Sequence, residues 1–178
     1  LALFKKFKPD TNINMLPIFI KDKGFNFNLN DGIFNTLKEE YPEFPNWWSK
    51  KVSNRDVYAY KDENETINAV LVPKIETNEP IDCTPTLIRN RILKICLFKV
   101  AEHTRGLKLG ERLLRMGIDY AIQNEVEEIF LTHFRKENDF LVYLLEEFGF
   151  YKFGENSRGE EVYLKRITKE DNIEIQEE

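Results

Sequence analysis

The chain has 178 residues, of which 42% are hydrophobic, 13% aromatic and 32% charged, and this composition excludes a disordered or fibrous protein. Its length suits one domain with one main core and is short for two ordinary domains. The formal net charge of -5 disfavours a general nucleic-acid binder, because such binding rests on neutralisation of phosphates by Lys and Arg.

The two cysteines, Cys83 and Cys96, have neither the paired spacing of a metal site nor the number that a disulfide framework needs. We therefore expect reduced thiols, a cytoplasmic protein and no bound metal. No run reaches the roughly 18 apolar residues that span a bilayer, so no membrane partner is expected. The first residue is Leu1 rather than Met, which leaves open whether the chain is a piece of a longer protein.

The N-terminal part predicts an extension, a strand and a helix. Residues 1–12 are basic and apolar and end near a proline, so we expect a linker or N-terminal extension there. Alternating apolar residues predict a strand over 15–20. Apolar residues at helical spacing predict a helix over 31–41, which begins at Asn30 or Asp31 as N-cap and is stopped by the prolines that follow.

The middle of the chain predicts strands. Strands over 57–61 and 66–73 are expected to pair as an antiparallel hairpin across the polar loop 62–65. Residues 74–90 contain two prolines and are expected to be irregular, and such a long loop often lines a site. The dense apolar run over 92–100 predicts a central strand that is buried on both faces.

The second half predicts alternating helices and strands. In chain order we expect a helix over 109–124, a strand over 128–134, a helix over 140–148, and a hairpin of strands over 150–153 and 161–167. Residues 169–178 are expected to form an acidic, frayed tail. The order of elements indicates a mixed α/β domain over 13–168.

A phosphate-binding turn is expected at 105–110, between a buried strand and an amphipathic helix. Unpaired backbone N–H groups and the positive end of the helix dipole meet at such a turn, which favours phosphate. Arg105 and Lys108 add positive charge, and the absence of side chains at Gly106 and Gly110 lets a diphosphate approach the backbone. The spacing is neither that of the P-loop nor that of the dinucleotide GxGxxG motif, so a different phosphate ligand is expected.

The turn resembles the acyl-CoA motif, RxxGxG or RxxGxA, of the GNAT superfamily of N-acetyltransferases, which lies between that family's fourth strand and the next helix. Arg105, Lys108 and Gly110 stand at the motif positions, with Lys108 in place of the first glycine and Gly106 two residues earlier. Residues 138–150 resemble the family's second half, in which an Asn opens a helix that ends in Gly-Phe eleven and twelve residues later.

The resemblance covers residues 90–167 and implies a GNAT-like acyl-CoA N-acyltransferase fold, with a central, mostly antiparallel sheet, splayed strands 4 and 5, and flanking helices. It also implies acetyl-CoA as co-substrate, with its pantetheine arm on the fourth strand and its pyrophosphate on the turn. The cofactor-binding residues that it implies are Phe98, Lys99, Val100, Arg105, Gly106, Leu107, Lys108, Leu109, Gly110 and Asn138.

The chemistry that the resemblance implies is direct attack of a primary amine on the acyl carbonyl, which needs a base and ideally an acid for the leaving thiolate. Glu102, His103 and His133 are considered as bases because each falls near the carboxyl end of a strand beside the expected opening, and Glu102 and His133 are the two that we select. Many family members use as acid a Tyr at the position of Leu145, which cannot donate a proton. Tyr143 lies about 200° away around the helix and faces elsewhere.

Structural explanations stay open for several of these residues. His133 can be a strand-end histidine bonded to backbone, and Glu102 can be a solvated turn residue. Trp47 and Trp48 either stack on an acceptor or pack in the core, and the core is expected for at least one of them. Acidic residues such as Glu76 either favour a cationic acceptor or belong to solvated loops.

Three interpretations result. The leading one is an enzyme that moves an acetyl group from acetyl-CoA to a small-molecule or peptide amine, with the acceptor and the oligomeric state unidentified. The alternative is a catalytically weak or inactive acyl-CoA-binding or regulatory module of a larger protein, which Leu145 and the non-Met start favour. A nucleic-acid partner is the third, and it rests only on the basic patches formed by Lys5, Lys6, Lys8, Lys50 and Lys51.

Overall fold

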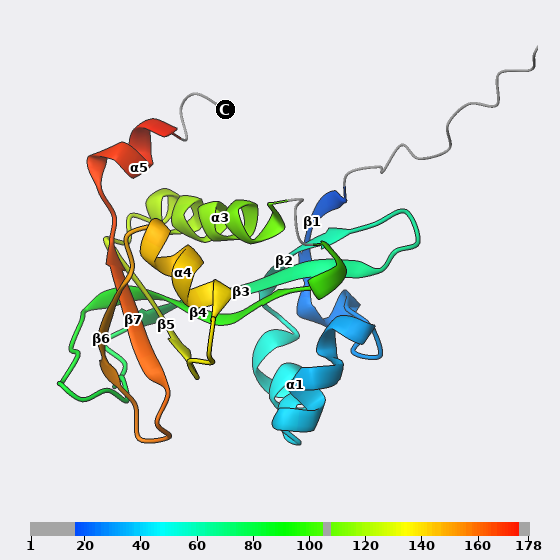
Figure 1. The fold of residues 1–178 in the computed structure, drawn as a ribbon, viewed down its shortest axis with the longest axis horizontal. Helices are drawn as coiled ribbons and strands as arrows, with labels where there is room; N and C mark the ends of the chain where they lie inside the picture. Colours follow the sequence, from blue (N-terminus) through cyan, green and yellow to red (C-terminus); the bar gives the residue numbers. More distant parts are fainter. Residues whose placement is uncertain (1–16, 105–107, 175–178) are drawn as a thin grey trace, which may run out of the picture.

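The computed structural model describes residues 17–104 and 108–174, and within them seven strands form one sheet in the order β1-β2-β3-β4-β5-β7-β6 (Figure 1). The strands are β1 (Ile18–Lys23), β2 (Asp56–Lys61), β3 (Ile67–Thr77), β4 (Arg91–Val100), β5 (Glu128–His133), β6 (Tyr151–Glu155) and β7 (Glu161–Arg166). The helices are α1 (Asn35–Glu40), α2 (Phe44–Trp47), α3 (Leu109–Gln123), α4 (Phe140–Glu147) and α5 (Lys169–Glu174). The shorter turns are η1 (Gly24–Asn26), η2 (Gly32–Phe34), η3 (Trp48–Val52) and η4 (Glu102–Thr104).

The sheet is mostly antiparallel, as expected. Five of its neighbouring pairs are antiparallel, and β4 with β5 is parallel. The strand β7 lies between β5 and β6, so the C-terminal hairpin joins the sheet through its second strand. The prediction of a mixed α/β sheet flanked by helices is therefore confirmed.

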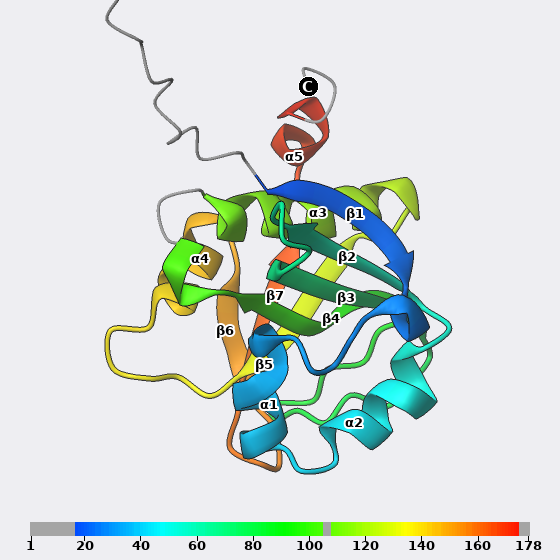
Figure 2. The same cartoon turned by 90° about the vertical axis from the view of Figure 1, so that its right-hand side faces the viewer.

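Alternating side chains divide the core between the two faces of the sheet. On one face, which we call the α3 face, Leu71, Leu93 and Ile129 pack with buried residues of α3 and α4. On the opposite face, the α1 face, Phe34 and Trp48 from the short N-terminal helices pack against β2, β3 and β4. Figure 2 shows α3 and α1 on opposite sides of the sheet.

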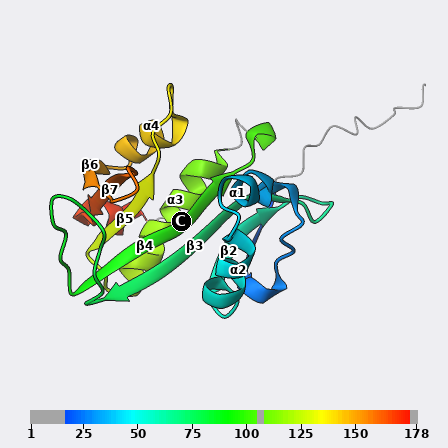
Figure 3. The same ribbon diagram turned by 90° about the horizontal axis from the view of Figure 1, so that it is seen from below.

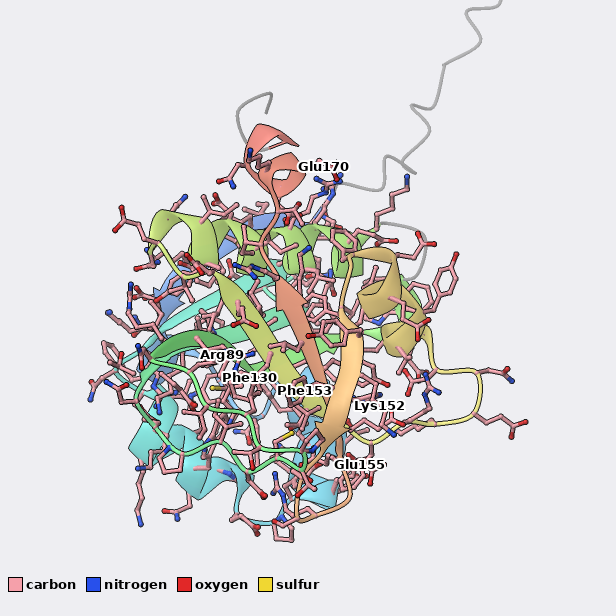
Figure 4. All side chains as sticks on the ribbon, turned by 90° about the vertical axis from the view of Figure 1, so that its left-hand side faces the viewer. Arg89, Phe130, Lys152, Phe153, Glu155 and Glu170 are labelled. Atoms are coloured by element: carbon pink, nitrogen blue, oxygen red, sulfur yellow. The ribbon has the colours of Figure 1, made fainter. Side chains whose placement is uncertain are left out.

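Loop 78–90 covers another part of the α1 face. Its Leu87 packs with Phe130 of β5 in a separate buried cluster, and its Arg89 forms an ion pair with Glu128 at the start of β5 (Figure 4). Seen from below, β3 and β4 pass between this loop and the helices α1 and α2 (Figure 3). The α1 face therefore carries two separate buried clusters, one under the N-terminal helices and one under this loop.

The first helical segment begins at one of the two N-cap residues that the sequence predicts. Of the two expected N-caps, Asp31 is the one used: its Oδ1 accepts from the Ile33 N–H at 3.1 Å. Its Oδ2 accepts from the Ile67 N–H at 3.0 Å, which fixes the helix start to β3. The helical segment is divided into η2 and α1 and ends before Pro42, as expected.

Some expected boundaries are wrong. The first strand extends to Lys23, beyond the expected end at residue 20, because Lys21 and Lys23 reach Asp56 on β2, at 3.7 and 2.7 Å. β3 continues to Thr77 through the stretch expected to be irregular, because its pairing with β4 runs on to Thr77 and Arg91. The lysines of β1 find their partner on the neighbouring strand, whereas Lys74 of β3 pairs with Glu76 on the same strand and with Glu79 of the following loop.

The expected frayed tail is also wrong in its first part. Residues of the tail form the short helix α5, which Asp171 holds at its start by accepting from the Thr168 N–H at 2.7 Å. The same carboxylate lies 3.2 Å from the Lys165 Nζ, whose side chain is buried. The extension expected over 1–12 lies outside the described residues.

Candidate active site

β4 and β5 separate after a short paired stretch. Their parallel register comprises Leu93 with Ile129 and Lys94 with Phe130, although β4 continues to Val100 and β5 to His133. The two strands therefore splay toward their carboxyl ends. This opening, which we call the β4–β5 opening, is the splay that was expected between the fourth and fifth strands.

A β-bulge accompanies the splay. Val72 of β3 pairs with Leu97 of β4, whereas the next residue, Pro73, pairs with Ile95, so Cys96 is an extra residue in β4. A bulge bends its strand and disrupts the local ladder, here at the stretch of β4 beyond its pairing with β5. Burial raises the pKa of the Cys96 thiol, which favours a packing role over a nucleophilic one.

The expected phosphate-binding turn leads into α3. Its residues 105–107, that is Arg105, Gly106 and Leu107, lie outside the described residues. Lys108 is the N-cap of α3 and has left-handed backbone angles, φ 55° and ψ 30°, with an exposed side chain. This is the position of the motif glycine, and a lysine adopts these angles at a cost of about 1–2 kcal/mol. The turn geometry is thus compatible with Lys108.

The role of Gly110 differs from the one expected. A Cβ built on Gly110 would lie 3.0 Å from Cδ2 of Leu144 and 4.0 Å from Cγ2 of Val100. The missing side chain therefore lets α4 approach the first turn of α3, rather than leaving open space for a diphosphate. Leu109 beside it is also buried. Both residues position the helix start.

The end of β4 presents its side chains alternately to the two faces. Phe98 and Val100 are partly buried against the core of the α3 face. Lys99 points to the α1 face, where its Nζ donates to Thr36 Oγ1 of α1 at 2.9 Å. The side chains of all three are thus held by the protein, and backbone groups are what this stretch offers to a ligand.

The helix α4 begins one residue later than the resemblance implies. Asp139 is its N-cap, accepting from the Val142 N–H at 3.2 Å, and Asn138 precedes it, exposed, with φ 52°. At the other end, Gly149 has φ 86°, in agreement with its expected role as helix terminator. Asn138 lies at the same end of the sheet as the β4–β5 opening, directly before α4.

Of the two candidate bases, His133 has a carboxylate partner. Alternation along β5 places His133 on the α3 face with Leu131, and its Nε2 lies 2.6 Å from Asp139 Oδ2. The explanation of a histidine bonded to backbone at this nitrogen is therefore wrong. Glu102 lies in η4 after β4 and is exposed, as is His103. His133 is the last residue of β5, and Glu102 follows the end of β4, so each candidate lies at the carboxyl end of one of the two splayed strands.

The α4 helix does not supply an acid. Leu145 is fully buried, and Tyr143 is 60% exposed, with the hydrogen bond to Glu147 raising the pKa of its phenol. Tyr143→Phe is accordingly expected to leave kcat within about twofold of wild type, because the phenol points to solvent. Initial rates of thiol release would check this, and a hundredfold loss would show that the phenol reaches the reacting atoms.

Asp139 is expected to stabilise the chain in a pH-dependent way. Although burial acts to raise it, the pKa of Asp139 is lowered from 3.8 by hydrogen bonds from the Lys136 N–H and His133. A lowered folded pKa means that the stabilisation is present above that ordinary value and is lost as the pH falls through the folded pKa. Asp139→Ala is expected to lower the free energy of unfolding by about 1–2 kcal/mol at neutral pH.

Urea unfolding of wild type and variant at about pH 7 and about pH 3 checks this expectation, because the difference should shrink at the lower pH. Asp139→Asn is the matched control, since an asparagine oxygen still caps the helix but does not titrate. Equal stability of Asp139→Ala and wild type at neutral pH would contradict the capping role.

Sequence reasoning missed a buried carboxylate on the opposite face. Glu160 precedes β7 and is buried, with its Oε2 3.3 Å from the Thr132 Oγ1 of β5. Alternation places Thr132 on the α1 face with Phe130. This contact arises because β7 pairs with β5, a long-range pairing that local sequence patterns do not specify. A buried carboxylate therefore lies beside the carboxyl end of β5.

Solved structures share this fold at low sequence identity. NAA60 of Arabidopsis thaliana, in complex with a bisubstrate analogue, is 15% identical with a TM-score of 0.59, and the match covers 85% of this chain and 100% of that one. An IAA acetyltransferase from Bacillus cereus is 14% identical with a TM-score of 0.57, covering 84% and 99%. The NatC complex bound to a Gag peptide and CoA is 16% identical with a TM-score of 0.52, covering 84% and 99%. These likenesses show the fold.

Sequence comparison identifies the family. None of the curated proteins compared with the chain matches it. Within the described parts of the chain, none of the helices has both the length and the apolar content needed to cross a membrane. The model of the acetyltransferase (GNAT) family matches residues 28–150, which is more than half of the chain. This protein therefore belongs to the acetyltransferase (GNAT) family.

Proposed function

We propose that this chain transfers an acetyl group from acetyl-CoA to a primary amine. The observation that carries the proposal is the β4–β5 opening with its bulge at Cys96, together with the left-handed Lys108 at the start of α3. An extended pantetheine arm can pair with backbone of 98–100, and the diphosphate can meet the N-terminus of α3 and the Lys108 ammonium. The residues expected to bind the cofactor remain those of 98–100 and 105–110, with Asn138, and the buried Leu109 and Gly110 would take part through backbone N–H groups alone.

The reaction proposed is direct transfer. The nitrogen of the amine attacks the acyl carbon, the C–S bond breaks, a base takes the proton from nitrogen, and the thiolate of CoA takes a proton. Backbone N–H groups of the bulged β4 are suited to stabilising the negative charge that develops on the carbonyl oxygen. The protein therefore contributes mainly position and electrostatics.

His133 and Glu102 remain the proposed bases. A carboxylate beside one imidazole nitrogen orients the ring, and when Nε2–H of His133 points to Asp139, Nδ1 carries the lone pair that accepts a proton. Glu102 is exposed and can act through water. We place the activity in the domain over 13–168, apart from the segment 169–178, and in the cytoplasm, where thiols such as Cys83 stay reduced.

One observation favours a second candidate, an acyl-CoA-binding module with weak or no turnover. Leu145 is buried in the core and Tyr143 faces solvent, so α4 offers no phenol to protonate the thiolate. Water or another group must then supply that proton, and turnover depends on it. The two candidates share the binding site and differ in whether CoA is released.

The experiment that separates them is a thiol-release assay with acetyl-CoA and a panel of polyamines, amino acids and peptides, with acetylated products identified by mass. We expect amine-dependent release of CoA together with a mass-identified product. Binding of acetyl-CoA without release for every amine would support the binding module. Absence of both binding and release would contradict the proposed function.

A further inference from the structure

Three cations lie on the α1 face at the closed end of the β4–β5 opening. Lys74 of β3 and Lys94 of β4 are directly opposite each other in the antiparallel pair. Arg55, which precedes β2, donates from Nη1 to Cys96 Sγ at 3.9 Å. Lys94 also pairs with Phe130 in the parallel register, and it is the last residue of β4 that pairs with β5. We call Arg55, Lys74 and Lys94 the cationic strip, which borders the opening through β4 itself.

The side chains of the cationic strip share one face and are within reach of solvent. Lys94 Nζ lies 5.9 Å from the centre of the Phe130 ring, which belongs to the α1 face. Lys74 shares that face because residues directly opposite in an antiparallel pair point the same way. Cys96, the partner of Arg55, packs at the margin of the α1-face cluster. All three cations are half-buried, and 28% of the Lys74 side chain is exposed.

The acidic residues nearby do not neutralise the whole strip. Glu76 Oε1 and Glu79 Oε2 lie 3.7 and 2.7 Å from the Lys74 Nζ. Glu76 is buried in β3, so the explanation of a solvated loop residue is wrong for it. In the parts of the chain that the structure describes, no carboxylate lies within 4.0 Å of the Arg55 guanidinium or the Lys94 ammonium. Two cations of the strip are therefore without an acidic partner there.

The strip favours negative charge on this face. Like charges that are directly opposite on a sheet destabilise it, as with Lys74 and Lys94. A thiol is a weak acceptor, so the contact with Cys96 does not satisfy the five N–H donors of the Arg55 guanidinium. The pKa of Glu79 is lowered mainly by its hydrogen bond from Lys74. The positive charges of Arg55 and Lys94 lower this pKa further.

We propose that Arg55 and Lys94 bind a carboxylate of the acceptor, so that the acceptor is a small amine that also carries an acid group. The proposal rests on the proposed acetyltransferase function, which puts the acetyl group near the bulge at Cys96. A planar guanidinium matches a carboxylate with two parallel hydrogen bonds, and an ammonium adds a point charge.

The same arrangement suits the attacking nitrogen. Cys96 follows Lys94 by two residues, which is about 6–7 Å along a strand and within the length of a short amino acid. With its carboxylate on the strip, such a molecule places its amine at the β4–β5 opening. The cations disfavour a protonated amine, and the nitrogen that attacks the acyl group must be neutral. The acceptor class is therefore an amino acid rather than a polyamine.

The thiol of Cys96 is a reporter of the strip. Iodoacetate and iodoacetamide alkylate a thiol in the same way, and only iodoacetate carries a carboxylate. The second thiol, Cys83 in loop 78–90, follows the acidic Asp82 and serves as internal control. We expect the rate ratio, iodoacetate over iodoacetamide, to be about tenfold higher at Cys96 than at Cys83. Peptide mass spectrometry after timed labelling of the folded protein measures both thiols in one sample.

Variants of the strip separate charge from structure. Lys94→Gln and Arg55→Gln are each expected to lower the rate ratio at Cys96 about threefold, whereas Lys94→Arg keeps the charge and should keep the ratio. Arg91→Gln is the matched control, because Arg91 of β4 donates to the Asn124 carbonyl at the end of α3 and should leave the ratio unchanged. A merely structural role predicts that Lys94→Arg and Lys94→Gln behave alike. Thermal unfolding of each variant would verify that it folds.

Protection of Cys96 identifies the acceptor. Glycine, 3-aminopropanoate and 4-aminobutanoate are compared with amino alcohols of the same chain lengths, each as a protectant against the neutral iodoacetamide with CoA present. We expect an amino acid to protect at about tenfold lower concentration than its amino alcohol, and Lys94→Gln to abolish the difference. A short peptide that begins with aspartate, compared with the same peptide beginning with asparagine, shows whether the carboxylate comes from a free amino acid or from a peptide.

Each outcome decides for or against the site. A rate ratio at Cys96 no higher than at Cys83, or one that Lys94→Gln leaves unchanged, would overturn the carboxylate site. Resistance of Cys96 to both reagents would overturn it as well, because the strip would then be closed to ligands. Equal protection by amino acids and amino alcohols would overturn the acceptor class. Failure of the proposed function has a different signature, since acetyl-CoA would then neither bind nor release CoA, whereas the alkylation rates are read without acetyl-CoA.

Discussion

Lys108→Glu is expected to weaken acetyl-CoA binding about 30- to 100-fold, that is by about 2–3 kcal/mol. Lys108 is exposed at the N-terminus of α3, where an ammonium group can meet a diphosphate. A carboxylate at this place repels the same group and still leaves the helix N-terminus intact. Calorimetric titration of wild type and variant with acetyl-CoA measures the change.

Two further variants isolate the cause. Lys108→Gly removes the charge but suits the left-handed backbone, so it should weaken binding only a few-fold and raise the free energy of unfolding by about 1 kcal/mol. Lys50→Glu, in η3 on the α1 face, makes the same charge change at an exposed position and should leave affinity unaltered. If Lys108→Glu binds as tightly as wild type, the diphosphate does not lie at this turn.

Trp48→Ala is expected to lower the free energy of unfolding by about 3–5 kcal/mol, the largest effect on stability that we predict. Trp48 is 3% exposed, its ring lies 5.3 Å from that of Phe34, and its Nε1–H donates to the Gly24 carbonyl at 2.9 Å. The alanine variant loses this packing and one of the two donors to the Gly24 carbonyl, which also accepts from the Phe27 N–H at 3.1 Å. Urea unfolding at 25 °C measures the difference.

Trp47 provides the matched comparison. It is adjacent in sequence but only partly buried, and it packs at the margin of the same cluster. Trp47→Ala should therefore cost clearly less than Trp48→Ala. Equal losses would contradict the assignment of Trp48 to the core, which is the role that the sequence led us to expect for at least one of the two tryptophans.

Local patterns predict the helices and strands of this chain well where one face is apolar. The run over 109–124 and the breaker Gly149 define α3 and the end of α4 because helical spacing and a left-handed glycine act locally. The predicted end of the first strand is wrong because the charged residue Lys23 lies in β1 and forms an ion pair with Asp56 of β2. The local sequence around Lys23 does not reveal that a residue on another strand will lie beside it.

The candidate site was predictable only in part. The splay of β4 and β5 followed from the family resemblance, since no local pattern reports where two parallel strands stop pairing. Asp139 could have been found, because an Asp before an apolar helical run is a typical N-cap, six residues after His133. Glu160 could not, because its contact with Thr132 depends on β7 lying beside β5.

The measurement that tests the central claim most directly is a crystal structure of the chain with acetyl-CoA bound. We predict the diphosphate against residues 105–110 at the N-terminus of α3, the pantetheine arm along 98–100 of β4, and the acetyl group in the β4–β5 opening near the bulge at Cys96. Acetyl-CoA bound elsewhere on the chain, or no binding at millimolar concentration, would contradict this account.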